Sequence, residues 1–424
     1  MLTPVSASCG TGRDGAIVGS SYTSMSAVLR IKTIVVFYLV VFVASMTATW
    51  YGVDLPDLNV GTFVLVFLFM YPFVYVHELG HVLAGLAVGI GISRVAIGGG
   101  REIFRKTIGR ILFVQRIAPG NGITYIGEMS APPSKLALLA FWSGGALLQI
   151  IVMVPLLVFG DFTMRDLLSP GGLHIGSALV AANGLLLLVT LVPFPVRIQG
   201  VRVLNDGLKI LTIPFMQPRE VASFPSHGPI MHAYELMERK DYRAAERILE
   251  ECVRRFPSST VARVNVATCL MKRGQLGPAI DLLQRLLEGD HEHKYDFMIH
   301  NNLAWAALLQ GTDESLALAE TFSAQAYKHR PSVRYVQGTR ASVLAALGEH
   351  DQAVRILKHG VRPGRRVDKQ TNPITGFIVL GYAYRQLGRG AIADRYMRVV
   401  DQNVDQLDAD ERLLFEMLQT RSVT

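Results

Sequence analysis

The stretch VYVHELGHVL, residues 74–83, lies inside an apolar run that covers residues 61–92. A membrane-spanning helix needs about 20 mostly apolar residues, and this run exceeds that length. His77 and His81 are four residues apart, so a helix projects both imidazoles from one face, where they can share a metal ion. Glu78 is then placed to act as a general base. Ionisable groups are costly in a bilayer, so the stretch predicts a functional metal site inside a membrane helix.

Three further apolar runs reach spanning length, at residues 34–50, 136–159 and 173–195. Basic residues gather in alternate loops between the four runs. The first loop has no Lys or Arg, the second has seven, and the third has only Arg165 beside Asp161 and Asp166. Because positive charge marks cytoplasmic loops, this pattern predicts four spans with both termini in the cytoplasm. The histidines are then in the cytoplasmic half of the second span.

The composition of the 424 residues is 50% apolar and 18% charged, with a formal net charge of +8. A basic total in a membrane protein is more often an orientation signal than a sign of nucleic-acid binding, and no nucleic-acid motif is present. The cysteines Cys9, Cys252 and Cys269 have no zinc or redox spacing. Residues 1–29, rich in Ser, Gly and Thr, predict a disordered tail. A cleaved signal peptide is the alternative, but no clear cleavage site follows the first run.

A catalytic zinc ion takes three protein ligands and leaves one position for water. Among the remaining candidates, His174 and Asp161 fall on the outer side of the membrane and Glu128 lies in the basic loop. Asp206 follows the fourth run on the same side as the histidines, and Gly207 allows close backbone approach. Two plainer readings stay open. Asp206 and Gly207 are also typical of a turn or a helix cap. The two histidines are also compatible with hydrogen bonding inside a helix bundle, without a metal ion.

The set of motifs resembles the site-2 protease family of intramembrane metalloproteases, over about residues 60–215. Besides HELGH, the matching segments are AIGGGREIF at 96–104, APGNG at 118–122, WSGG at 142–145 and LVPFP at 191–195. The resemblance implies hydrolysis of a peptide bond in or near the membrane, with Zn²⁺ bound by His77, His81 and Asp206 and with Glu78 as general base. It also implies a strand-rich insertion over 94–128. This insertion could pair with an unwound substrate, or it could be a hairpin with a purely structural role.

This chain departs from the family pattern at three places. Ten residues separate Pro195 from Asp206, where many members have two or three. Thr190 stands where the family often has Asn, and Gln149 ends a segment that usually reads Gly-Pro-x-x-Asn. None of these changes removes a proposed metal ligand. They leave Asn183, Thr190 and Gln149 as candidates for holding the substrate backbone.

From about residue 230 the pattern changes to short amphipathic helices. Alanines recur at spacings of 34, 40, 34 and 40 residues, and glycines precede three of them by five residues. The alanines are Ala245, Ala279, Ala319, Ala353 and Ala393, and the glycines Gly274, Gly348 and Gly388. A 34-residue period with small residues where paired helices touch resembles tetratricopeptide repeats, about five in number. Such repeats form a concave surface that binds proteins or peptides. Exposed solenoid histidines are favoured over a second metal site at His291, His293, His300 and His329.

The sequence therefore predicts a mainly α fold: a polytopic bundle of about four spans with a small β-hairpin insertion, followed by an α-solenoid. The expected domains are a tail (1–29), a metalloprotease domain (30–216), a linker (217–229) and a repeat domain (230–424). The favoured function is an intramembrane zinc protease of the plasma membrane, whose cytoplasmic repeats recruit a membrane protein substrate or a regulator. The alternative is an inactive membrane-anchored repeat scaffold. A transporter is disfavoured, since neither paired charges along a pathway nor internal symmetry is found.

Overall fold

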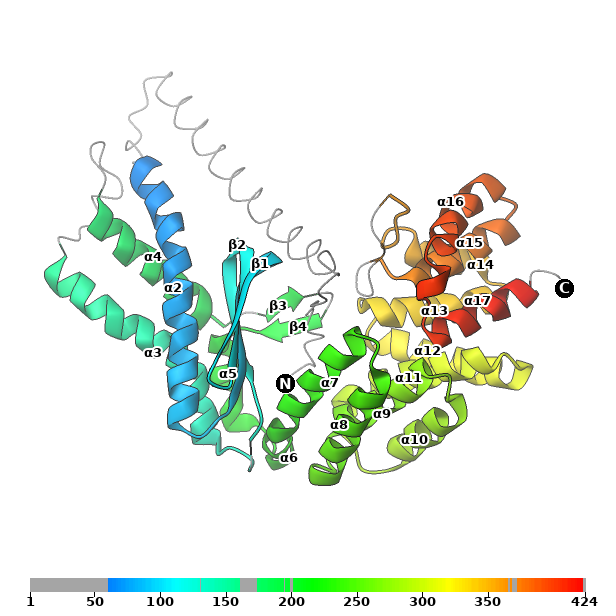
Figure 1. Ribbon diagram of the computed structural model, residues 1–424, viewed down its shortest axis with the longest axis horizontal. Coiled ribbons are helices and arrows are strands. Elements are labelled where there is room, and N and C mark those ends of the chain that lie inside the picture. Colours follow the sequence, from blue (N-terminus) through cyan, green and yellow to red (C-terminus); the bar gives the residue numbers. More distant parts are fainter. Residues whose placement is uncertain are drawn as a thin grey trace, which may run out of the picture. The chain divides into compact units, whose positions relative to one another are not determined.

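The computed structural model describes residues 60–129, 131–160, 174–193, 195–198, 201–364, 367 and 372–421. The chain divides into two compact units (Figure 1). The first runs to Val196 and resumes over Leu204–Gly228, and the second holds Arg197–Val203 and the chain from Pro229 onward. The predicted tail, the predicted span 34–50 and the loop 161–173 lie outside the described residues.

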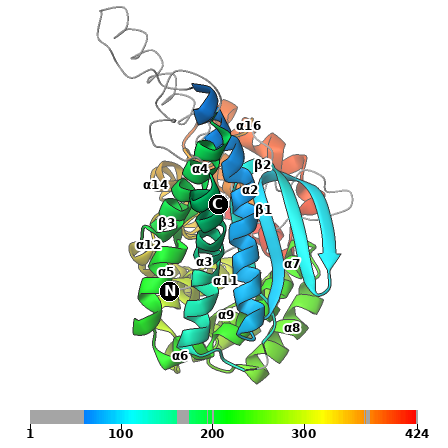
Figure 2. The same cartoon turned by 90° about the vertical axis from the view of Figure 1, so that its left-hand side faces the viewer.

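Three apolar helices form the centre of the first unit: α2 (Val60–Ala87), α3 (Lys135–Phe159) and α4 (Ile175–Leu191). They contact one another, and Figure 2 shows them running side by side. Among the described residues, α2 and α3 are long and apolar enough to cross a membrane, whereas α4 is shorter, at 17 residues. Two of the four predicted spans therefore have the required length in the structure.

Helix α2 ends earlier than its apolar run predicts. It stops at Ala87, and Gly89 then adopts a positive φ of 76°. A glycine in this left-handed conformation is a common helix terminator, because other residues pay a steric cost there. The remaining apolar residues begin a strand instead.

The insertion after α2 is a bent hairpin of β1 (Ile92–Ile108) and β2 (Ile111–Ile126), which confirms the predicted strand-rich segment. The register is interrupted, so residues 94–97 of β1 pair both with residues 112–115 and with residues 122–125 of β2. β2 also packs against α2 (Figure 2). The hairpin is thereby fixed beside the helix that carries the histidines.

A second hairpin follows α4 and consists of β3 (Pro195–Ile198) and β4 (Val201–Leu204). The chain continues through α5 (Asp206–Thr212), η2 (Ile213–Phe215), α6 (Pro218–Ala222) and η3 (Phe224–Ser226). Residues 217–229, expected as a linker, are thus largely helical, and Val221 and Phe224 are buried in the core of the first unit. Pro218 occupies the first turn of α6, where proline fits a helix well, so this proline marks a helix start.

The second unit is built from helix pairs with the predicted period. The pairs are α7 (His227–Glu238) with α8 (Tyr242–Arg255), α9 (Thr260–Lys272) with α10 (Leu276–Glu288), α11 (Asp296–Gln310) with α12 (Asp313–His329), α13 (Arg334–Ala346) with α14 (His350–Leu357), and α15 (Ile374–Gln386) with α16 (Gly390–Asp401). The five recurring alanines are each fully buried on a second helix. Gly274, Gly348 and Gly388 have positive φ at the turns within pairs.

Backbone contact between α2 and α3 depends on small residues. A Cβ added to Gly144 would lie 2.5 Å from the Cβ of Ala84, and one added to Gly80 would lie 2.3 Å from the Gly144 carbonyl oxygen. Small residues allow such close approach between membrane helices. The crossing sits one turn from the two histidines, so it sets the distance between α3 and the candidate site.

We expect Gly144→Ala to destabilise the protein by about 1–3 kcal/mol, because the added methyl group forces the two helices apart. Gly176→Ala, in α4, is the matched control, since no atom lies within 4 Å of a Cβ at that position. Thermal unfolding of the detergent-solubilised protein measures both. An equal midpoint for the two variants would contradict this account of the crossing.

Candidate metal centre

Asp206 reaches the site because Asn205 joins the end of α4 to the start of α5. The Asn205 side chain accepts a hydrogen bond from the Leu208 amide (3.1 Å) and donates to the Val192 carbonyl oxygen (2.6 Å). Gly207 lies so close to α4 that an added Cβ would be 1.9 Å from the Leu191 carbonyl oxygen. Between α4 and Asp206 the strands β3 and β4 pair with each other, and β4 leads the chain back to Asn205 at the helix end. The long spacing in the sequence therefore leaves Asp206 beside α4.

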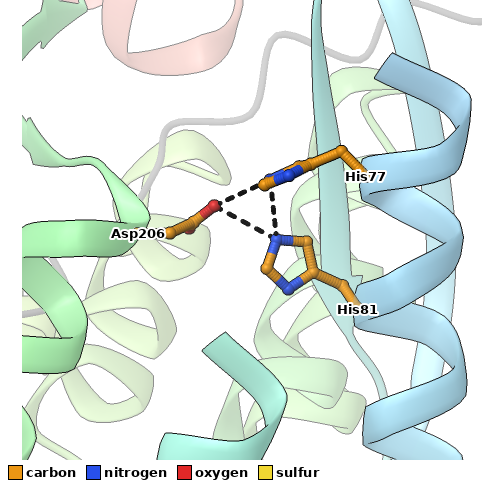
Figure 3. Close-up of side chains that lie close together, drawn as sticks. All are labelled: His77, His81 and Asp206. Atoms are coloured by element: carbon orange, nitrogen blue, oxygen red, sulfur yellow. Dashed lines mark hydrogen bonds and ion pairs between the residues drawn. The ribbon is translucent and has the colours of Figure 1, made fainter. Parts of the chain in front are cut away.

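Three side-chain atoms from distant segments meet at one point (Figure 3). Asp206 Oδ2 lies 3.0 Å from His77 Nε2 and 3.1 Å from His81 Nε2, and the two Nε2 atoms are 3.1 Å apart. The two histidines are at most 5% exposed, and the Asp206 side chain is 14% exposed. The structure thus brings together all three residues that were predicted as metal ligands.

The tautomer of His77 follows from a chain of hydrogen bonds behind it. The Asn183 amide nitrogen donates to the Gln149 backbone carbonyl (2.9 Å), so Asn183 Oδ1 accepts from Gln149 Nε2 (3.0 Å). Gln149 Oε1 therefore faces His77 Nδ1 at 2.8 Å. An amide oxygen only accepts, so Nδ1 carries the proton and Nε2 presents a lone pair. Gln149 and Asn183 are both fully buried.

His81 is held in the same tautomer by a different acceptor. Its Nδ1 lies 2.8 Å from the backbone carbonyl oxygen of Phe141, on α3. A carbonyl oxygen cannot donate, so this nitrogen also carries the proton. Partners of this kind, on the ring nitrogen away from the metal, are typical of metal-binding histidines.

The donor set fits a divalent transition-metal ion. Two imidazole nitrogens and a carboxylate oxygen converge within 3.0–3.1 Å of one another. When neither Nε2 atom carries a proton, this arrangement is repulsive unless a metal cation lies among the three atoms. Two histidines and one carboxylate are a ligand set that catalytic zinc sites use.

Glu78 lies between the two histidines in sequence and is buried against β2. Its Oε2 accepts a hydrogen bond from the Thr124 hydroxyl at 2.6 Å. A Cβ added to Gly122 would lie 2.3 Å from the Glu78 Cγ and Oε1 atoms, so only glycine leaves room for this carboxylate. The β1–β2 insertion therefore fixes the orientation of Glu78.

The electrostatic environment favours an ionised Asp206. Burial opposes the charged form, but the neighbouring Lys209 ammonium holds the pKa of the Asp206 carboxyl well below its usual range. Lys209 Nζ lies 3.2 Å from Asp206 Oδ1 and 3.5 Å from the centre of the Trp142 ring. The ammonium group is thus held by a cation–π contact as well as by the carboxylate.

The candidates for holding substrate lie in different places. Gln149 and Asn183 lie behind His77, whereas the Thr190 hydroxyl donates to the Leu187 carbonyl of its own helix (3.0 Å). Sequence reasoning missed Thr124 and Asn205. The only sequence signals for them were the neighbouring Gly122 and the Asn-Asp-Gly string.

A second group of possible ligands lies in the repeats. His291 Nε2 is 2.7 Å from Asp296 Oδ1, and His293 Nδ1 is 3.5 Å from Asp296 Oδ2. His293 is exposed, as the sequence predicts, whereas His291 is buried, contrary to that prediction. The contact with Asp296 ties the loop before α11 to the first turn of that helix.

Comparison with known proteins gives one family match. The model described as "Peptidase family M50" matches residues 63–369. No curated protein matches the chain. Among solved structures, a thermophilic tetratricopeptide-repeat protein of Thermus thermophilus has 20% identity and a TM-score of 0.35, covering 46% of this chain and 99% of its own. The tetratricopeptide-repeat domain of P58(IPK) has 16% identity and a TM-score of 0.25, covering 68% and 78%.

We expect Gln149→Leu to lower the affinity for zinc by about 10–100-fold, because His77 then loses the acceptor that fixes its tautomer. Thr190→Val is the matched control, since the Thr190 hydroxyl contacts only its own helix among the hydrogen bonds described. Titration against a competing chelator measures both affinities. Equal affinities would show that the amide chain does not support the metal site.

Proposed function

The chain belongs to peptidase family M50, and from this membership we propose that it is an intramembrane zinc metalloprotease that hydrolyses peptide bonds of membrane-associated proteins. The observation that carries the proposal is the convergence of His77 Nε2, His81 Nε2 and Asp206 Oδ2, with Glu78 directly after His77 in α2 and its carboxylate held by Thr124. These are the residues that a zinc-dependent hydrolysis requires.

In this proposal the three converging side chains hold the ion, and Gln149 and the Phe141 carbonyl keep both imidazoles in the binding tautomer. Bound zinc polarises the scissile carbonyl and lowers the pKa of water toward about 7. Glu78 takes the proton from the attacking water and transfers it to the leaving amine. The Thr124 hydroxyl positions the Glu78 carboxylate for both transfers.

We assign substrate binding to the part of β2 that lies next to Glu78. Residues 122–124 pair with residues 95–97 on one side, and no other described strand pairs with them. A substrate helix must unwind before hydrolysis, because its carbonyl groups are engaged in internal hydrogen bonds. An unwound segment can add to the edge of a sheet, with main-chain hydrogen bonds providing the affinity. Thr190, half-buried near the end of α4, is a further candidate contact.

The remaining features of the proposal concern topology and partners. We infer four spans with both termini in the cytoplasm, a location in the plasma membrane, and repeats that recruit a substrate or regulatory protein. The basic residues of the second loop and of the segment after α4 support this orientation. We infer no nucleic-acid partner.

The alternative function is an inactive scaffold that anchors the repeats to a membrane. A scaffold has no use for a buried carboxylate beside two histidines, and burying one costs free energy unless it serves a purpose. Glu78 is 4% exposed and is held by a dedicated hydroxyl group. This favours the enzyme.

We expect Glu78→Gln to retain zinc and to lower cleavage of a membrane-tethered peptide by about 10²–10⁴-fold, because the general base is lost while the ligands remain. His81→Ala is the paired variant and should lose both zinc and cleavage. Metal content and product formation are measured in the same preparations. Unchanged turnover in Glu78→Gln would refute the mechanism, and a zinc-loaded wild type that cleaves nothing would favour the scaffold.

Topology is tested with reporter enzymes fused to the C-terminus, each active on only one side of a membrane. We expect activity from the cytoplasmic reporter alone, because the charge pattern of the loops fixes the orientation. Activity from the reporter that requires the opposite side would overturn the four-span assignment.

A further inference from the structure

The last helix of the chain, α17 (Ala409–Arg421), lies across the repeats. It contacts α9, α11 and α15, which are the first helices of the second, third and fifth pairs (Figure 1). A helix of 13 residues is only about 20 Å long. It reaches three different pairs only if their first helices curve around it. α17 therefore occupies the concave face of the stack, which is the surface that repeat proteins use for binding.

Two lysines hold the start of α17 through buried carboxylates. Lys272, at the end of α9, lies 3.0 Å from Asp410, 3.4 Å from Asp408 and 3.8 Å from Glu411. Lys240 lies 3.0 Å from the other oxygen of Asp408. The side chains of Asp408 and Asp410 are 2% and 3% exposed. Although burial opposes it, the three carboxylates raise the pKa of Lys272, so the ammonium form is retained.

Lys240 occupies a position where three of the other four pairs have glycine. It lies five residues before Ala245, as Gly274, Gly348 and Gly388 lie five residues before their alanines. All four have positive φ, and Lys240 (62°) is the only such non-glycine residue described. A side chain in this conformation costs about 1 kcal/mol relative to glycine. This cost is offset by the contact that the lysine makes with Asp408.

The apolar side of α17 fills the middle of the concave face. Leu414 and Leu418 are almost fully buried and belong to the same core cluster as α13 and α15. Trp305 of α11 donates from its indole nitrogen to Asp410 at 3.0 Å. At the far end, Arg421 donates to the carbonyl oxygens of Ala346 (3.4 Å) and Gly311 (3.3 Å). The acidic first turn, the apolar stripe and the basic end of α17 thus each contact a complementary surface of the repeats.

We propose that α17 is an internal ligand of the repeat domain, and that the partner recognised by the repeats is an amphipathic helix with an acidic first turn, which displaces α17 from the concave face. The partner is of this class because Lys240 and Lys272 demand carboxylates and the surface beyond them is apolar. The inference does not depend on proteolytic activity.

The probe is a fluorescent synthetic peptide of residues 405–421, added to the full-length protein in detergent. In the release variant Asp410→Ala/Glu411→Ala, the start of α17 loses two of the three carboxylates that contact Lys272, while both lysines stay in place. We expect the peptide to bind this variant at least about 10-fold more tightly than it binds the wild type, since each lost charge-assisted contact is worth about a factor of ten. Adding Lys272→Ala to the release variant should abolish the gain. Equal binding to wild type and release variant, or binding to neither, would overturn the proposal.

A disulfide provides the opposite test. A Cβ at Gly274 would lie 3.8 Å from the Cβ of Ala409, which matches the usual Cβ separation across a disulfide. The oxidised Gly274→Cys/Ala409→Cys protein should bind no peptide, even with the two release substitutions added, and reduction should restore binding. Gly274→Cys alone controls for backbone strain at this position, where φ is 78°. Peptide binding to the oxidised lock would contradict occupation of the concave face by α17.

Hydrogen exchange of the unaltered protein covers the case in which the release variant does not fold. We expect the amides of α17 to exchange faster than those of α15 and α16, because an internal ligand opens separately from the repeats. Exchange of α17 together with α15 and α16 would mean that the helix is an integral part of the solenoid, and the proposal would be wrong.

Discussion

The first unit is organised around a repulsion. Three atoms that carry lone pairs, from residues as far apart in sequence as His77 and Asp206, are held 3.0–3.1 Å from one another away from water. Where neither imidazole carries a proton at Nε2, partial charges of the same sign at this distance destabilise the fold unless a metal cation lies between them. The surrounding contacts hold these three atoms together. They are the backbone contact between Gly80 and Gly144, the amide hydrogen bonds behind His77, and the hydrogen bonds of Asn205 to the end of α4. The proposed metal ion would therefore couple part of the fold's stability to its own binding.

Local patterns predicted the residues of the site but not their supports. The histidine spacing is a property of one helix, and loop charge placed Asp206 on the same side of the membrane. The role of Gln149 follows from Asn183 and a backbone carbonyl, which no local pattern reveals. Thr124 meets Glu78 because of an interrupted strand register. Long-range packing of this kind determines which side chains contact one another. Such contacts cannot be predicted from local patterns in a single sequence.

The same contrast holds for the fold. The repeats were predictable because small residues recur wherever paired helices touch, as at Ala245 and Ala279. The helices within the predicted linker 217–229 were not foreseen, because proline suits both linkers and first helical turns. Helix α17 follows the last repeat and carries no repeat signature, so its position across the concave face came only from the structure. The predicted span at 34–50 lies outside the described residues.

The β3–β4 hairpin bears on how such chains are recognised. It shows that the number of residues between the fourth apolar run and its aspartate is not a physical requirement of the site. The requirement is the position at which the chain returns to α4. Asn205 sets this position because its side chain donates hydrogen bonds to the last carbonyl groups of α4. A search pattern with a fixed gap would pass over this chain. A pattern that asks for a helix-capping amide directly before the acid, at any distance, would retrieve it.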